Sequence, residues 1–264
     1  MDQREMRRTD PTRGVMSVAI VGPGRMGNAI AAALSGNDDF ELTGPLGRGA
    51  HAAGSDVALL CVPDREIAAA AAAISPRTIV GHCSGATGLE PLAPHEGFSM
   101  HPLMTVSPAG ATFAGATAAI DAGGERALEI ARRITEALGM RSVRMRPEDR
   151  VAYHAAASIA SNFLVTLEAA AERLAASAGV GREALAPLVR ATVENWIALG
   201  PEGALTGPVA RGDELTVARQ RQAITERAPE LLELFDALTA ATRELAAAPQ
   251  TADATPQLQE VSAA

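Results

Sequence analysis

Three glycines near the start of the chain have the spacing of a phosphate-binding turn. Gly22, Gly24 and Gly27 follow the G-x-G-x-x-G pattern in the stretch GPGRMG. Residues 16–22 are apolar and are predicted to form a buried strand, and residues 25–34 are predicted to form a helix. In such a strand–turn–helix unit the glycines permit a tight turn, close approach of a pyrophosphate, and close helix–strand packing. The alternative is a structural turn that needs glycine only for its backbone conformation.

The turn predicts a dinucleotide site at the start of the helix. Phosphates would bind the free N–H groups of the first helical turn. The predicted cofactor-binding residues of this stretch are Gly22, Pro23, Gly24, Arg25, Met26 and Gly27.

The segment after the second predicted strand, residues 40–46, favours NADP over NAD. NAD-binding folds usually place an acid there, on the ribose 2′-hydroxyl. This chain has Gly-Arg-Gly-Ala-His instead, so Arg48 is predicted to bind a 2′-phosphate, with help from His51. The alternative is that Arg48 is an ordinary solvent-exposed loop cation.

Two further strand ends are predicted to lie beside the cofactor. Strands over residues 56–62 and 78–82 end at Val62-Pro63-Asp64 and at His82. Since ligands bind outside the carboxyl ends of parallel strands, we predict that Val62, Pro63, Asp64 and His82 contact the dinucleotide. Asp64 is also a good N-cap for the helix predicted over residues 63–74.

Polar residues in the second half of the chain are candidates for the substrate site. In AYHAAASIASNFLVTL, His154, Ser158, Ser161 and Asn162 fall on one side of a helix at 3.6 residues per turn. They either face a cleft or form satisfied internal hydrogen bonds. In LTGPVARGDELTVARQ, Arg211 is suited to clamp a substrate carboxylate or to pair with Asp213, which is a good helix N-cap.

The pattern of elements divides the chain at Pro147. Strands and helices alternate up to residue 146, which predicts a mainly parallel, Rossmann-type α/β sheet, and all later segments are helical. We predict a loose leader over residues 1–14, a dinucleotide-binding domain over 15–147, a helical domain over 148–248 and a tail over 249–264. The remaining predicted strands are residues 98–101, 117–121 and 142–145, and the helices are 125–138, 148–178, 182–199, 214–227 and 230–247.

Composition excludes several classes of protein. The 264 residues carry a net charge of −8 and only 3% aromatics, which argues against binding nucleic acid. No apolar run is long enough to span a membrane, and the N-terminus has no signal-peptide core. Cys61 and Cys83 lie in apolar runs without metal-site spacing, so we expect reduced core thiols, no metal site and a cytoplasmic protein.

Six stretches occur together in a characteristic order: GPGRMG, VPD, HCSGA, MHPL, AYHAAASIASN and TGPVARGD. Together they resemble bacterial proteins that join a Rossmann-like NAD(P)-binding domain to a helical domain of unknown function, over about residues 16–245. That family lies in the 6-phosphogluconate-dehydrogenase-like superfamily, with β-hydroxyacid dehydrogenases, ketopantoate reductases and pyrroline-5-carboxylate reductases. The resemblance implies hydride transfer between the two domains, a small-molecule substrate such as ketopantoate, and a homodimer built through the helical half.

One departure from these relatives concerns the proton donor. β-Hydroxyacid dehydrogenases and ketopantoate reductases use a lysine, in the former one helical turn before an asparagine; here Asn162 is present but Ser158 occupies the earlier position. A histidine titrates in the range that carbonyl reduction needs. We therefore predict His154 as general acid, His101 as second candidate, Asn162 or Ser84 as orienting groups, and Ser158 and Arg211 as substrate contacts.

The leading interpretation is an NADP-dependent reductase of a small 2-keto or imino acid, with no membrane partner. A first alternative is a pyrroline-5-carboxylate or imine-type reductase. A second is a dinucleotide-binding sensor or scaffold without catalysis, which the missing lysine favours.

Overall fold

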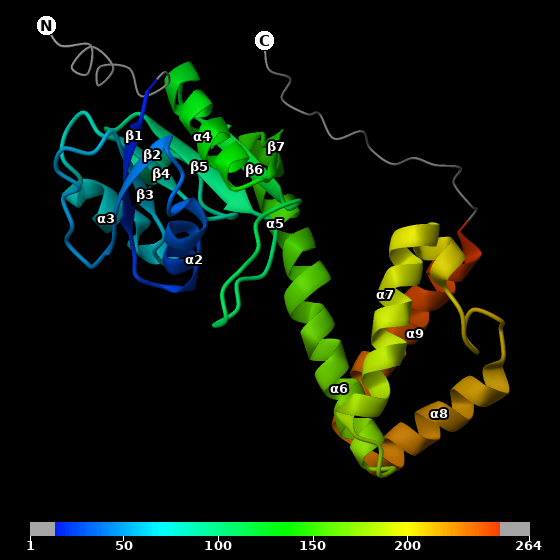
Figure 1. Cartoon of the computed structure of the whole chain (residues 1–264). Coiled ribbons are helices and arrows are strands. Elements are labelled where there is room, and N and C mark those ends of the chain that lie inside the picture. Colours follow the sequence, from blue (N-terminus) through cyan, green and yellow to red (C-terminus); the bar gives the residue numbers. More distant parts are fainter. Residues whose placement is uncertain (1–13, 249–264) are drawn as a thin grey trace, which may run out of the picture. The chain divides into compact units, whose positions relative to one another are not determined.

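A computed structural model of the chain describes residues 14–248, which divide into two compact units, residues 14–159 and residues 160–248 (Figure 1). The first unit contains one seven-stranded sheet with strand order β2-β1-β3-β4-β5-β6-β7. Every neighbouring pair is parallel except β5 and β6. The strands are β1 (Met16–Val21), β2 (Phe40–Leu46), β3 (Val57–Leu60), β4 (Ile79–His82), β5 (Gly97–Pro102), β6 (Thr117–Ala122) and β7 (Arg141–Arg144).

Helices cover both faces of the sheet, as the unbroken apolar strand sequences require. All four residues of β3 are buried, so this strand has no solvent-facing side. On one face α2 (Arg25–Leu34) and α4 (Glu125–Ala137) pack Ile30, Leu34 and Ile130 against the strands. On the other face α3 (Ile67–Ala73) packs Ile67 and Ala71. The predicted fold class, a mainly parallel α/β sheet followed by helices, is confirmed.

The topology places a crevice above β1. The chain leaves β1, crosses to β2 on one side, and then returns to form β3 on the other side. Such a reversal separates the connections at the carboxyl ends of β1 and β3, which is where doubly wound sheets bind ligands. Gly22 follows β1 directly, and Cys61 follows β3.

The second unit is helical. The long helix predicted over residues 148–178 begins in the first unit as a 3-10 turn (Pro147–Asp149) and α5 (Arg150–Ser158). It continues through a π-helical turn (Ile159–Phe163) into α6 (Leu164–Ala176). The later helices are α7 (Arg182–Ala204), α8 (Glu214–Arg227) and α9 (Leu232–Ala247), the last preceded by a 3-10 turn (Pro229–Leu231).

Several boundaries differ from the predictions. The helix predicted over residues 63–74 opens as a 3-10 turn (Asp64–Glu66) before α3, and a further 3-10 turn spans Glu90–Leu92. The compact units divide after Ile159, whereas the sequence pattern predicts a domain boundary at Pro147. The predicted leader, apart from Gly14, and the predicted tail lie outside the described residues. Within residues 14–248, no helix is long and apolar enough to cross a membrane.

Candidate functional site

The turn between β1 and α2 admits only glycine at two of its three glycine positions. Gly22 has a φ of +114°, and a Cβ there would overlap the carbonyl oxygen of Cys61. A Cβ at Gly27 would overlap the carbonyl oxygen of Gly22. A Cβ at Gly24 would meet nothing within 4 Å, so this backbone borders open space. Helix α2 has no side-chain cap, which leaves its first N–H groups available to an anion.

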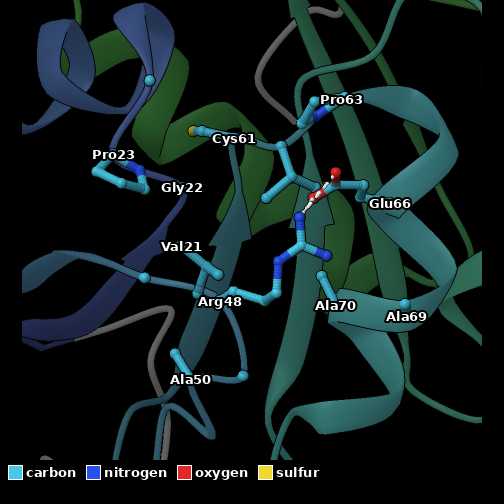
Figure 2. A pocket seen from close by; sticks show the side chains of 14 residues that line it. Val21, Gly22, Pro23, Arg48, Ala50, Cys61, Pro63, Glu66, Ala69 and Ala70 are labelled. Atoms are coloured by element: carbon cyan, nitrogen blue, oxygen red, sulfur yellow. Dashed lines mark hydrogen bonds and ion pairs between the residues drawn. The ribbon is translucent and has the colours of Figure 1, made fainter.

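A cavity of about 510 Å³ opens beside this turn, at the carboxyl ends of β1, β2 and β3 (Figure 2). It brings together six of the predicted cofactor residues: Gly22, Pro23, Gly24, Arg48, Val62 and Pro63. They come from three loops that are distant in sequence, so the sheet topology alone assembles this part of the site.

The other predicted cofactor residues do not line this cavity. Arg25 instead lines a second, open depression of about 860 Å³ between α2 and residues 107–111, which also includes Pro23 and Gly24. Met26 packs against the core, and Gly27 serves the helix–strand contact. His51 does not line the cavity, and its Nδ1 lies 2.8 Å from the carbonyl oxygen of Ala73, so a contact of His51 with the cofactor stays a prediction.

Arg48 is paired with an acid that the sequence pattern did not indicate. Its Nη2 donates to both carboxylate oxygens of Glu66, at 3.0 Å each, across the cavity (Figure 2). The Glu66 side chain is 27% exposed and the Arg48 side chain 82%. An acid is therefore present at the cavity after all, supplied by the 3-10 turn after β3 rather than by the end of β2.

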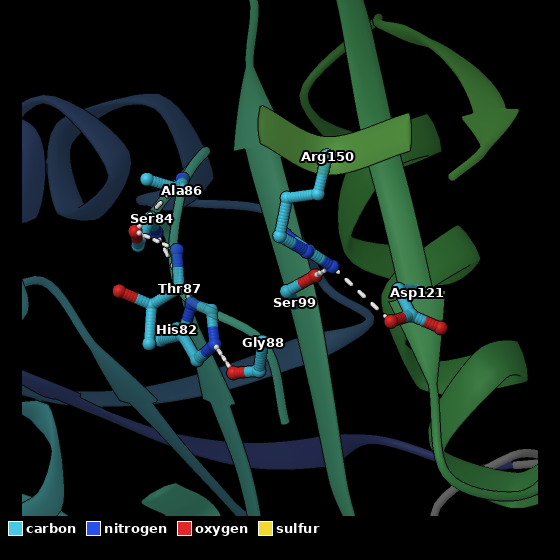
Figure 3. Close-up of polar contacts among 8 residues, drawn as sticks. All are labelled: His82, Ser84, Ala86, Thr87, Gly88, Ser99, Asp121 and Arg150. Carbon is cyan, nitrogen blue, oxygen red and sulfur yellow. Dashed lines mark hydrogen bonds and ion pairs between the residues drawn. The ribbon is translucent and has the colours of Figure 1, made fainter. Parts of the chain in front are cut away.

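His82 shapes the loop after β4 rather than lining the cavity. The Ser84 N–H donates to its Nδ1 at 3.2 Å, so the proton is on Nε2, which donates to the Gly88 carbonyl at 2.9 Å (Figure 3). The side chain is fully buried, and burial lowers its pKa from 6.5. A buried neutral ring with both nitrogens engaged is a structural element of this turn.

Asp64 and Ser84 join the loops after β3 and β4. The Ser84 hydroxyl donates to Asp64 Oδ2 at 2.7 Å and accepts from the N–H groups of Ala86 and Thr87 at 3.2 and 2.9 Å. The alternative role of Asp64 as a helix N-cap is wrong, because the 3-10 turn that it begins has no side-chain cap. Ser84 therefore has no proton left to orient a substrate carbonyl.

An aromatic cluster lies at the carboxyl end of β5. His101 Nδ1 lies 2.8 Å from the Tyr153 hydroxyl, and the His101 and His154 ring centroids are 6.0 Å apart. The loop after β4 reaches this cluster, since a Cβ at Gly85 would lie 2.8 Å from His154 Cδ2 and 2.9 Å from His101 Cε1. The two predicted catalytic histidines are thus neighbours, and Gly85 has no room for a side chain beside them.

Burial sets the protonation states of two members of this cluster. The pKa of His101 is lowered from 6.5 to about 4, chiefly by burial and to a smaller degree by the nearby His154 and Arg150, while Asp64 opposes them. Burial also raises the pKa of Tyr153 to about 12, against the effect of Arg150. At neutral pH the pair is an uncharged imidazole and an uncharged phenol.

A buried ion pair anchors the helix that carries Tyr153 and His154. Arg150, the first residue of α5, is only 4% exposed. Its Nη2 donates to Ser99 Oγ on β5 at 2.8 Å and to Asp121 Oδ2 on β6 at 3.1 Å (Figure 3). These contacts tie the start of α5 to the antiparallel pair of strands.

The remaining candidates make only local contacts. Ser158 donates to the His154 carbonyl at 3.1 Å. Asn162 lies in the π-helical turn, which changes the helical phase, so the alignment of Asn162 with His154 at 3.6 residues per turn does not hold. Arg211 is exposed and has no side-chain ion pair among the described residues, while Asp213 caps α8 through Thr216, as predicted. Substrate contacts by Ser158, Asn162 and Arg211 stay predictions.

Sequence reasoning missed three contributors to these sites: Glu66, Tyr153 and Arg150. Tyr153 is the only tyrosine of the chain and adjoins His154, which was a usable signal. Glu66 and Arg150 gave no local signal, because their partners are 18 and 29 to 51 residues away.

A comparison with protein families matches residues 116–242 to a family described as a domain of unknown function (DUF2520). The match includes His154, Ser158, Asn162 and Arg211, but not the glycine turn. A comparison with curated proteins finds no match.

Solved structures share the fold over most of the chain. A candidate NADP oxidoreductase, BF3122 from Bacteroides fragilis, is 18% identical, with a TM-score of 0.73, and the alignment covers 87% of this chain and 98% of that one. Protein TM1727 from Thermotoga maritima is 25% identical, with a TM-score of 0.69 and the same coverage. The pyrroline carboxylate reductase of Plasmodium falciparum, with NADP bound, is 10% identical, with a TM-score of 0.56, covering 88% and 98%. The chain thus has the fold of NADP oxidoreductases.

Proposed function

We propose that this chain is an NADP-dependent oxidoreductase that reduces a small 2-keto or imino acid, with ketopantoate as the leading candidate. One observation carries the proposal: the open backbone at Gly24 and the Arg48 guanidinium border one cavity at the carboxyl ends of β1 and β2. The fold shared with NADP oxidoreductases supports it.

The residues of the cavity fit a dinucleotide that carries a 2′-phosphate. A pyrophosphate beside Gly24 would meet the uncapped N–H groups at the start of α2. Arg48 uses only Nη2 on Glu66, so Nε and Nη1 have no hydrogen bond to other described residues and are available to a phosphate. Val62 and Pro63 supply apolar wall.

The protein must supply a proton when a carbonyl is reduced. NADPH supplies the hydride when bound. The chain contains no lysine at all, so the donor used by the β-hydroxyacid dehydrogenases and ketopantoate reductases is absent. His101 is uncharged at neutral pH and shares its Nδ1 with Tyr153, which makes it a poor acid there. His154, beside it, remains the proposed general acid, and we propose that the His101–Tyr153 pair orients it and the substrate.

An imino acid is a second candidate substrate, and the uncharged state of His101 favours it. A protonated imine already carries its proton and needs only the hydride at carbon, so the protein need not act as an acid. A cationic substrate is also better tolerated beside a neutral imidazole than beside an imidazolium.

Turnover experiments test the proposal. NADPH oxidation is followed at pH 7 with a panel of 2-keto acids, including ketopantoate, and of cyclic imino acids, including pyrroline-5-carboxylate. With a keto acid, His154→Gln should lower kcat by about 100-fold and leave the NADPH Kd unchanged. With an imino acid the same variant should lose far less. NADPH binding without turnover on any member of the panel would favour the sensor alternative.

We further propose that the chain forms a cytoplasmic homodimer through its helical unit. Helices α6 and α7 have no buried residue, and large apolar side chains on this unit face solvent: Phe163, Val165, Leu188, Trp196, Ile197 and Leu199. An exposed apolar surface of this extent is typical of an obligate interface. Light scattering should show a dimer for the native protein and a smaller species for Trp196→Asp.

The proposed cytoplasmic location rests on the two cysteines. The free thiols of Cys61 and Cys83, whose sulfur atoms lie 3.8 Å apart, fit a reducing compartment.

A further inference from the structure

The cavity that borders the glycine turn holds one charge of each sign. Arg48 comes from the loop after β2, and Glu66 from the 3-10 turn after β3. They meet through two 3.0 Å contacts of one Arg48 nitrogen, so Glu66 faces the group that would read a 2′-phosphate (Figure 2).

The two partners differ in how firmly they are held. Glu66 is half-buried and directly precedes Ile67, which is 1% exposed in the core. Arg48 is mostly exposed and lies between Gly47 and Gly49, the latter with a φ of +78°. The Glu66 carboxylate is therefore the more buried partner in the cavity wall, and the exposed Arg48 is the partner with more room to adjust.

We propose that Glu66 sets the cofactor preference of the site by opposing Arg48. A 2′-phosphate that binds Nε and Nη1 of Arg48 is brought close to the Glu66 carboxylate, because that carboxylate accepts from Nη2 of the same guanidinium. The two anions then repel each other. A ribose 2′-hydroxyl instead can donate to that carboxylate, as it does to the acid at the end of the second strand in NAD-binding folds. Glu66 thus weakens the binding of NADPH and leaves the binding of NADH favourable. The site therefore binds both cofactors, with a moderate preference for NADPH.

This inference rests on the proposed function and is tested by binding alone, without a substrate. The Kd of NADPH and of NADH is measured by fluorescence or calorimetric titration at one low ionic strength for the native protein and for Glu66→Gln. The preference for NADPH is expressed as the Kd of NADH divided by the Kd of NADPH, and in this ratio any effect common to both cofactors cancels. We expect the preference for NADPH over NADH to rise by about three- to tenfold in Glu66→Gln.

A matched control variant removes one negative charge, as Glu66→Gln does, but at a position away from the cavity. Glu41 is exposed near the start of β2, at the opposite end of that strand from Arg48, so Glu41→Gln should leave the ratio unchanged. Circular dichroism and thermal melting confirm that both variants fold.

Two results overturn the inference while NADPH still binds. An unchanged ratio means that Glu66 does not sense the 2′-phosphate, and a fall in the ratio means that it supports Arg48 instead of opposing it. Failure of the native protein to bind either dinucleotide is a different result, because it removes the proposed function itself. In Arg48→Gln, where Glu66 acts without its partner, adding Glu66→Gln should raise the preference for NADPH again.

Discussion

The Nδ1 atom of His101 lies 2.8 Å from the hydroxyl oxygen of Tyr153, which links the end of β5 to the first turns of α5. The rings meet edge to face, with centroids 5.5 Å apart. Because burial keeps both groups uncharged at neutral pH, the bond joins neutral partners and holds α5 at the loop that contains Gly85.

The depressed pKa of His101 predicts a loss of stability in mild acid. The unfolded chain binds a proton to this residue below pH 6.5, whereas the folded protein does so only near pH 4. The destabilising contribution is therefore absent above pH 6.5 and grows as the pH falls, to at most about 3 kcal/mol at pH 4. The free energy of unfolding, measured in urea from pH 7 to pH 4, should fall less steeply in His101→Gln. Parallel curves would contradict the assignment.

The buried Arg150–Asp121 pair predicts a large effect of removing one partner. Arg150→Met leaves the Asp121 carboxylate buried without its cation, which should lower the free energy of unfolding by about 3–5 kcal/mol. Adding Asp121→Asn should recover part of that loss, because no unpaired charge remains. Arg146→Gln, on an exposed ion pair in the same segment, is the control and should leave the melting temperature nearly unchanged. Equal losses for the two arginines would contradict the anchoring role.

The glycine turn predicts opposite consequences for two similar substitutions. Gly24→Ala adds a methyl group to open space, so it should leave the melting temperature unchanged and weaken NADPH binding at least about tenfold by blocking the pyrophosphate. Gly22→Ala forces a side chain into a positive φ and against Cys61, and should destabilise the fold by more than about 2 kcal/mol. Thermal melts and NADPH titrations of both variants check this. A Gly24→Ala protein with native affinity would reduce the motif to a structural turn.

The sequence predicted the elements whose signals are local. The apolar run that contains Val57–Leu60 marked a buried strand, and α8 was predicted with its observed bounds, Glu214–Arg227, from Asp213 as N-cap. The π-helical turn was not predictable, since its residues continue an ordinary helical pattern.

Only part of the candidate sites could be predicted from the sequence. Glycine spacing predicted the turn, because the pattern itself carries the backbone requirement. The ion pair of Arg48 with Glu66 and that of Arg150 with Asp121 depend on which strands become neighbours. Asp64 likewise was expected as a helix cap, but the loop after β4 brings Ser84 to it instead.

We propose that the cavity beside Gly24 binds NADP through Arg48. An equilibrium titration of the native protein and of Arg48→Gln with NADPH and with NADH, at matched salt, tests this proposal without any substrate. The native protein should bind NADPH more tightly than NADH, and Arg48→Gln should weaken NADPH binding about tenfold or more while the affinity for NADH changes little. No binding of either dinucleotide, or equal losses for both, would contradict it.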